Sequence, residues 1–214
     1  MLGQFSIGPS IKFGRSNLPN DIESIRESEN YTEYGNNYAI GILNEYKLKN
    51  WFSVEIDLLF DHLSSQKFYF VDKNNSNLYK SNQLNKIGYL SIPLFLQFNY
   101  KKLNFNIGCQ TSFRISEYTK LTITDQDNSQ TIYEGNNYNM FLKKNIALTS
   151  AITYRLYENF ELELRYIKGF VNIMNEKTGY VYNASTTQFL FGLNYKFDFK
   201  KKKSTEEIPE KNDE

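Results

Sequence analysis

The chain has 214 residues, with 25 basic against 24 acidic residues and a formal net charge of +1. This length fits one β domain, and the balanced charge gives no strong field that would attract nucleic acid. A single cysteine, Cys109, and a single histidine, His62, exclude an intrachain disulfide and a cysteine-based zinc site, and no cofactor is expected.

Alternation of apolar and polar residues predicts eight strands. In chain order they are expected at about 3–14, 36–49, 51–62, 87–100, 102–118, 144–157, 160–166 and 187–199. The strand at 51–62 is typical: Phe52, Ile56 and Phe60 share one face, and Glu55 and Asp57 share the other. The second and sixth strands follow the pattern less cleanly.

The connections alternate in length. Lys49-Asn50, Tyr100-Lys101-Lys102 and Tyr157-Glu158-Asn159 form short turns. The long polar segments between them lie near 15–36, 63–86, 119–143 and 169–186. This layout is typical of an up-and-down outer-membrane barrel, with short periplasmic turns and long extracellular loops.

Two all-β folds share this pattern: a soluble barrel of lipocalin type, and an eight-stranded antiparallel transmembrane β-barrel. Three features favour the membrane barrel: nearly complete Phe, Leu and Ile rows, a polar face rich in Ser, Asn and Gln, and aromatic rings beside the short turns. We therefore expect an outer-membrane barrel over 1–199, with lipid as a partner, and a charged, disordered periplasmic tail over 200–214. Such a barrel needs an export signal, which we expect to have been removed before Met1.

The segment Tyr89-Leu90-Ser91-Ile92-Pro93-Leu94-Phe95-Leu96-Gln97-Phe98 resembles a strand of the outer-membrane β-barrel domain family of Bacteroidetes, often labelled PorT-like. Further similar stretches are Gly41–Tyr46 leading to Phe52–Glu55, Leu164–Tyr166 and Phe191–Phe197. The resemblance implies the same barrel and an outer-membrane location, with no catalytic residues to carry over. The matching Ile-Pro implies a tolerated bulge or kink at Pro93.

The polar faces carry charges that must pair inside a narrow barrel, because an unpaired buried charge is costly. We expect a lumenal charge network that holds the barrel's shape; the alternative is a polar path for ions or protons. Its members are predicted to be Glu55, Asp57, Asp61, Arg114, Arg155, Glu163, Arg165 and Lys196.

Other candidate sites lie outside this network. His62 beside Asp61 raises the alternative of a hydrolase, although a solvated residue at the membrane edge is the simpler interpretation. Cys109 lies on the apolar face and is interpreted as lipid-facing. Aromatic residues in the long polar segments are candidates for partner binding, with paired hairpin strands as the alternative: Phe68, Tyr69, Phe70, Tyr133 and Tyr138.

The sequence therefore predicts a non-enzymatic barrel with a structural or partner-binding role through its extracellular loops, as a subunit of an envelope or secretion-related assembly. Other envelope proteins are its expected partners. The alternative is a narrow channel for ions or small solutes.

Overall fold

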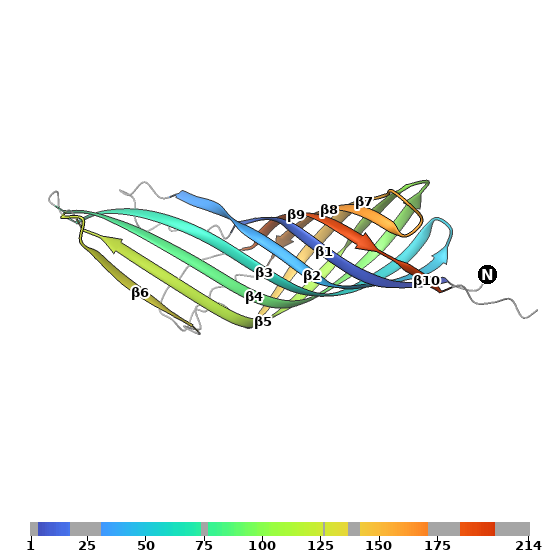
Figure 1. Cartoon of the computed structure of the whole chain (residues 1–214), viewed down its shortest axis with the longest axis horizontal. Helices are drawn as coiled ribbons and strands as arrows, with labels where there is room; N and C mark the ends of the chain where they lie inside the picture. Colours follow the sequence, from blue (N-terminus) through green and yellow to red (C-terminus); the bar gives the residue numbers. More distant parts are fainter. Residues whose placement is uncertain are drawn as a thin grey trace, which may run out of the picture.

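The chain forms one antiparallel sheet that curls into an elongated tube (Figure 1). The computed structural model describes residues 4–17, 31–73, 77–125, 127–136, 142–170 and 185–199. The strands are β1 (Gln4–Asn17), β2 (Tyr31–Lys49), β3 (Phe52–Lys73), β4 (Asn77–Tyr100), β5 (Leu103–Thr124), β6 (Gln130–Asn136), β7 (Lys144–Arg155), β8 (Phe160–Gly169), β9 (Thr187–Tyr195) and β10 (Phe197–Phe199). No helix in these ranges is long and apolar enough to cross a membrane.

The sheet closes on itself. Its order is β10-β1-β2-β3-β4-β5-β7-β8-β9, and β1 also pairs with β9, from Ser10 opposite Asn194 to Asn17 opposite Thr187. β9 and β10 form one final strand interrupted at Lys196, so the described ring has eight strand positions, while β6 pairs with β5 outside the ring. The predicted closed, eight-stranded antiparallel barrel is confirmed.

Three strands run much further than the sequence predicted. β3 continues to Lys73 and β4 begins at Asn77, so most of the expected loop 63–86 is a paired hairpin. Within the expected loop 119–143, β5 continues to Thr124 and pairs with β6. The strand ends predicted near 62, 87 and 118 were too short, and the alternative of paired hairpin strands is what these segments show. The apolar alternation stops where the strands leave the apolar band, whereas backbone pairing continues. The apolar band is the zone of outward-facing apolar side chains nearest the short turns, and we call the part of β2–β6 beyond it the far sheet.

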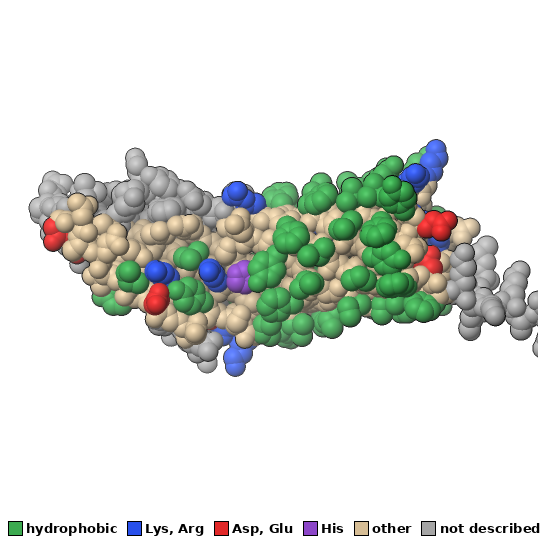
Figure 2. Space-filling view, in the orientation of Figure 1, with side chains coloured by type: hydrophobic (Ala, Val, Ile, Leu, Met, Phe, Trp, Pro, Cys, Tyr) green, Lys and Arg blue, Asp and Glu red, His purple; other side chains and the backbone are tan. Residues whose placement is uncertain are grey.

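The apolar rows face away from the lumen. On β1, Phe13 is 58% exposed and Ile11 39%, and Phe191 and Leu193 on β9 are exposed in the same way. Figure 2 shows hydrophobic side chains gathered, on the visible face, over the part of the tube nearest the short turns, while the opposite part carries fewer of them. The outward direction of these rows excludes the soluble barrel, in which they would form the core.

Aromatic rings gather at the short-turn end of the band. Trp51 stacks near Phe98 with ring centroids 6.4 Å apart, and the Lys49 ammonium lies 5.4 Å from the Trp51 ring centroid. Phe160 and Tyr195 meet edge to face at 4.7 Å. Such a girdle is typical of the boundary between lipid and water.

Close strand contacts in the ring depend on glycine. A Cβ added to Gly14 would lie 1.7 Å from the Phe189 backbone oxygen, and one added to Gly8 would lie 1.7 Å from that of Tyr195. Only glycine allows this approach of β1 to the final strand, where the ring closes.

Pro93 interrupts the ladder without shifting its register. β3 and β4 pair through Ile56 with Leu94 and again through Leu59 with Ser91, in the same register on both sides of the gap. The missing proline N–H accounts for the gap. Of the bulge or kink expected at Pro93, the register shows no bulge; the register shift in β4 lies between Gly88 and Tyr89 instead.

Candidate functional site

The lumen of the barrel contains two linked groups of buried charges. The first centres on Arg165 of β8, which donates from one guanidinium nitrogen to Asp57 Oδ2 at 2.7 Å and from Nε to Glu163. The Glu163 carboxylate also binds the Lys12 ammonium at 2.6 Å and accepts a hydrogen bond from Asn194 at 2.8 Å. All four charged side chains are at most 1% exposed.

The Arg165–Asp57 pair spans the lumen. β3 and β8 occupy opposite positions in the ring, with β2, β1 and β9 between them on one side and β4, β5 and β7 on the other. The guanidinium carbon also lies 4.6 Å from the Phe95 ring centroid on β4. Arginine suits this place because its flat, weakly hydrated head both pairs with carboxylates and stacks on rings.

The second group centres on Lys196, at the break between β9 and β10. Its ammonium lies 2.7 Å from Glu45, 3.2 Å from Glu55 and 2.9 Å from Glu161. Arg155 adds a longer contact of 3.5 Å to Glu161. Because these carboxylates come from β2, β3 and β8, a single lysine links three strands to the final one.

The eight predicted network residues do not all meet. Glu55, Asp57, Glu163, Arg165 and Lys196 lie in the two groups, and Arg155 lies at their edge with its side chain 37% exposed. Asp61 is buried and accepts a hydrogen bond from Gln110 at 3.2 Å, with no ion pair among the described contacts. Arg114 pairs instead with Glu117.

Sequence reasoning missed Lys12, Glu45, Glu161 and Glu117 as members. The alternation of β1 and β8 already places Lys12 and Glu161 on the polar face, so both could have been included. Glu45 follows a less regular stretch of β2, and Glu117 follows the irregular pairing of β4 and β5 near Gly88. For Glu45 and Glu117, the sequence pattern gave no comparable indication that the side chain faces the lumen.

On the side of these charges away from the short turns, buried neutral side chains share the lumen with Asp61 and the Arg114–Glu117 pair. Leu63 and Ile87 face each other across β3 and β4, and Ala147, Ile167 and Leu190 form a buried cluster. Beyond this layer, Asn37 donates to Gln188 at 2.7 Å and Asn145 to Thr186 at 3.2 Å. A barrel of eight strands is just wide enough for side chains to fill it.

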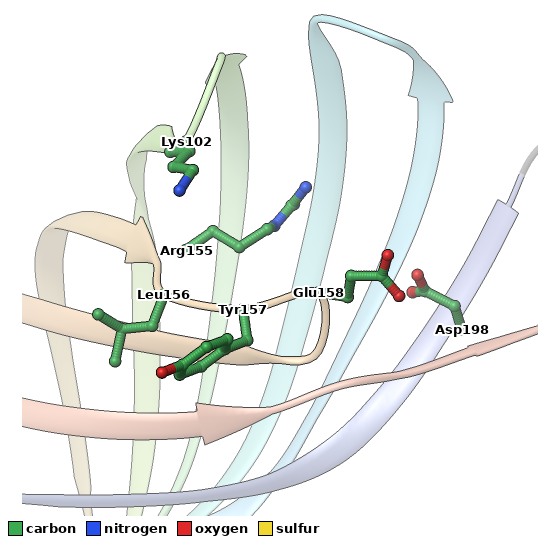
Figure 3. Close-up of a pocket in the computed structure, with 6 residues that line it drawn as sticks. All are labelled: Lys102, Arg155, Leu156, Tyr157, Glu158 and Asp198. Atoms are coloured by element: carbon green, nitrogen blue, oxygen red, sulfur yellow. The ribbon is translucent and has the colours of Figure 1, made fainter.

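The mouth at the short-turn end holds a cavity of about 470 Å³ (Figure 3). It is lined by Lys102, Arg155, Leu156, Tyr157, Glu158 and Asp198. The carboxylates of Glu158 and Asp198 point toward one another, and the Asp198 carboxylate accepts a hydrogen bond from Ser6 at 2.5 Å. The mouth is therefore of mixed charge.

His62 does not pair with Asp61. The His62 ring stacks on Tyr38 on the outer surface, with centroids 4.9 Å apart, whereas Asp61 faces the lumen. This arrangement removes the pair on which the hydrolase alternative depended. Cys109 is exposed on the apolar face, as interpreted from the sequence. Among the described residues, no group of three or more His, Cys, Asp or Glu side chains is placed to hold a metal ion.

The far sheet carries four of the five residues predicted for partner binding. Tyr133 on β6 is 58% exposed and its neighbour Ile132 50%. Phe68, Tyr69 and Phe70 lie within β3, but only their backbone is described, and Tyr138 and the tail 200–214 lie outside the described residues.

The turn between β5 and β6 is held by local hydrogen bonds. The Asn128 amide donates to the Asp125 carbonyl at 3.0 Å, and Asn128 has a φ of 63°, which asparagine tolerates. The Ser129 amide donates to the Asp127 carboxylate at 2.9 Å. Hydrogen bonds from the Ser129 side chain and backbone hold the pKa of Asp127 below its ordinary value.

A closed ring, an outward apolar band with a girdle of rings, and a lumen filled by paired charges define a transmembrane β-barrel. The sequence model of the outer membrane protein beta-barrel domain family matches residues 3–175. The chain belongs to this family and is located in the bacterial outer membrane. The short turns therefore face the periplasm and the far sheet faces the outside.

Several solved structures are similar in fold. Ail of Yersinia pestis, solved with the heparin analogue sucrose octasulfate, is 13% identical, with a TM-score of 0.47, covering 92% of this chain and 100% of that one. Neisserial surface protein A is 10% identical (TM-score 0.42, 90% and 97% covered). OprG of Pseudomonas aeruginosa is 13% identical (TM-score 0.38, 93% and 97% covered). No curated protein matches the chain.

Proposed function

We propose that this protein anchors an extracellular binding surface, the far sheet, to the outer membrane. The observation that carries the proposal is strand length. β3, β4 and β5 contain 22, 24 and 22 residues, whereas a tilted strand crosses the hydrocarbon core with about 9–11. Roughly half of each strand is therefore available outside the membrane.

The outermost strand supports this role. All but one residue of β6 are exposed, including two large apolar side chains, Ile132 and Tyr133. Among the described strands, β6 pairs only with β5. A strand with an exposed ring, an exposed isoleucine and one strand partner suits addition of a partner's strand or packing of a partner's apolar side chains.

The test is photo-crosslinking in intact cells that make the full chain. A photo-crosslinking amino acid replaces Tyr133 in one variant and the lipid-facing Phe191 in a control. We expect a protein adduct of defined mass at position 133 and only lipid adducts at 191. Equal adduct patterns at both positions would contradict the proposal.

One observation favours a narrow cation path as a second candidate. The lumen buries more carboxylates than cations: Glu45, Glu55, Asp57, Asp61, Glu117, Glu161 and Glu163 against Lys12, Arg165, Lys196 and the largely buried Arg114. The ion pairs that cross the lumen favour the anchor instead. Single-channel recording in planar bilayers separates the two, since an anchor should give no conductance and a cation path should give cation-selective steps.

The resemblance of Tyr89–Phe98 to PorT-like strands supports a further part of the proposal, membership of that Bacteroidetes group and of an envelope or secretion-related assembly. Co-purification of the intact barrel from detergent-solubilised membranes tests this part. A defined, stoichiometric complex is expected, and a barrel that purifies alone at native expression level would contradict it.

A further inference from the structure

One buried carboxylate of the lumen has no cation beside it. Asp61 is 1% exposed and forms no ion pair with any described residue. It lies on the inward row of β3, beyond Asp57 and the buried Leu59. Its Oδ2 accepts a hydrogen bond from the Gln110 amide at 3.2 Å, whereas Oδ1 is buried without a partner. A carboxylate in such a place is costly to ionise unless a positive charge accompanies it.

The described basic side chains that are buried in the lumen are matched by other carboxylates. Arg165 and Lys12 share the first group with two carboxylates, so the charges there balance. Lys196 already faces three carboxylates. Further out, the Arg114 guanidinium binds Glu117. None of these cations is in excess, so the carboxylate described above stays unmatched.

The side chains that accompany this carboxylate offer oxygen atoms. The Gln110 amide donates to the Ser112 hydroxyl at 3.1 Å, and the hydroxyl oxygens of Ser112 and Ser91 lie 2.7 Å apart. Thr149 lies diagonal to Gln110 on the neighbouring strand β7, with its side chain in the lumen. Gln110 Oε1 and the Thr149 hydroxyl oxygen are buried without partners, as Asp61 Oδ1 is. All five side chains are at most 2% exposed.

This set of oxygen atoms indicates which ligand it suits. A carboxylate, an amide carbonyl and hydroxyls are ligands of hard cations, whereas softer metals prefer sulfur or imidazole. A single carboxylate supplies one negative charge, which one monovalent cation balances. A water molecule could donate hydrogen bonds to two of the unpartnered oxygens, but it would leave the charge uncompensated.

Buried apolar side chains enclose this part of the lumen on both sides. Leu63 and Ile87 lie on the outer side, and Leu59 and Phe95 lie on the periplasmic side. Each of the four is at most 1% exposed. Because a charge pair is stronger where water is excluded, a cation held here would stay with the folded barrel.

We propose that Asp61, together with Gln110 and Thr149, binds one alkali-metal cation inside the lumen. The cation neutralises the carboxylate and satisfies the three unpartnered oxygens. It binds as the ring closes and stabilises the folded barrel. A cation held in an enclosed site is not a conducted one, so this inference depends neither on the far sheet nor on a cation path.

The first experiment measures bound sodium directly. The unmodified chain, Asp61→Asn and the control Asp127→Asn are folded in micelles of a non-ionic detergent and dialysed to equilibrium against radioactive sodium chloride. Asp127→Asn removes the same charge from the exposed turn between β5 and β6. We expect the unmodified chain and the control to hold one Na⁺ per barrel more than Asp61→Asn. Equal amounts of bound Na⁺ in all three proteins would overturn the proposal.

The second experiment measures the effect of the cation on stability. Urea unfolding is followed in sodium chloride, potassium chloride and N-methylglucamine chloride at one ionic strength, because the organic cation is too large for an enclosed site. A ligand that binds only the folded state raises the unfolding midpoint. The unmodified chain should therefore have a higher midpoint in sodium or potassium chloride than in the N-methylglucamine salt. A midpoint that is the same in all three salts would overturn the proposal.

Asp61→Asn should behave in the opposite way in this second experiment. Its midpoint should be the same in the three salts, and higher than that of the unmodified chain in N-methylglucamine chloride, because an amide carries no charge to bury. Heat-modifiable migration on gels checks that the variant folds. If it does not fold, Gln110→Met replaces it, since this change keeps the carboxylate and removes one oxygen. Gln110→Met should bind Na⁺ several-fold more weakly, and an unchanged affinity would overturn the proposal.

Discussion

The membrane ring and the far sheet are built from the same strands, yet they obey different constraints. In the ring, outward residues are apolar and inward charges are paired across the lumen, as with Arg165 and Asp57. In the far sheet, both faces carry polar residues and the described pairs are solvated, as with Lys120 and Glu134. The difference shows that lipid fixes both faces of a strand, whereas water leaves the backbone ladder as the main requirement.

The largest expected effect comes from breaking the lumenal pair. Arg165→Met leaves the carboxylates of Asp57 and Glu163 buried without their main partner, and should lower the free energy of unfolding by about 3–5 kcal/mol. The matched change Lys120→Met in the far sheet should cost at most about 1 kcal/mol. Urea unfolding from lipid vesicles measures both. Equal losses in the free energy of unfolding would show that the lumenal pair contributes no more to stability than the solvated pair.

A charge on the lipid face should cost less, and its cost should depend on depth. Leu58→Lys, in the middle of the outward row of β3, is expected to destabilise the barrel by about 2–4 kcal/mol. His62→Lys, at the edge of the same row, should cost about 0–1 kcal/mol. The same urea titration applies, and a flat profile along β3 would contradict the placement of the lipid boundary.

A smaller effect on stability is expected at the seam of the ring, where β1 pairs with β9. Gly14→Ala forces a Cβ against the Phe189 backbone, and should cost about 1–3 kcal/mol as β1 and β9 move apart. Gly135→Ala, in the exposed strand β6, should change stability by no more than about 0.5 kcal/mol. If both alanines leave the unfolding midpoint unchanged, close strand approach is not what requires glycine at the seam.

The smallest effect is expected at the outermost strand. Ile132→Thr should leave the free energy of unfolding within about 0.5 kcal/mol of the unmodified value, because the side chain is half exposed and supports no core. A large loss of stability would mean that β6 serves the barrel itself rather than a partner. Far-ultraviolet circular dichroism during heating is a sufficient measurement.

The alternation in the sequence predicted the eight strands of the ring, but not the full length of β3, β4 and β5 or the contacts inside the lumen. A strand in lipid needs apolar residues facing outward and polar residues facing inward, so the pattern predicts rows such as Phe52, Ile56 and Phe60 directly. Beyond the lipid this requirement ends, which is why the continuation of β3 to Lys73 has no alternation of apolar and polar residues. The pattern also predicts which residues face the lumen but not which meet there, because contacts such as Lys12 with Glu163 depend on the stagger of strands around the ring.

Trp51 gives the molecule an intrinsic optical reporter at a known depth. It is the only tryptophan, and its indole lies at the periplasmic turn between β2 and β3, against Phe98. Its emission therefore reports the polarity at one edge of the bilayer without contribution from the other. During insertion into vesicles, a blue shift in that emission would time the arrival of the periplasmic turns separately from the growth of β-structure.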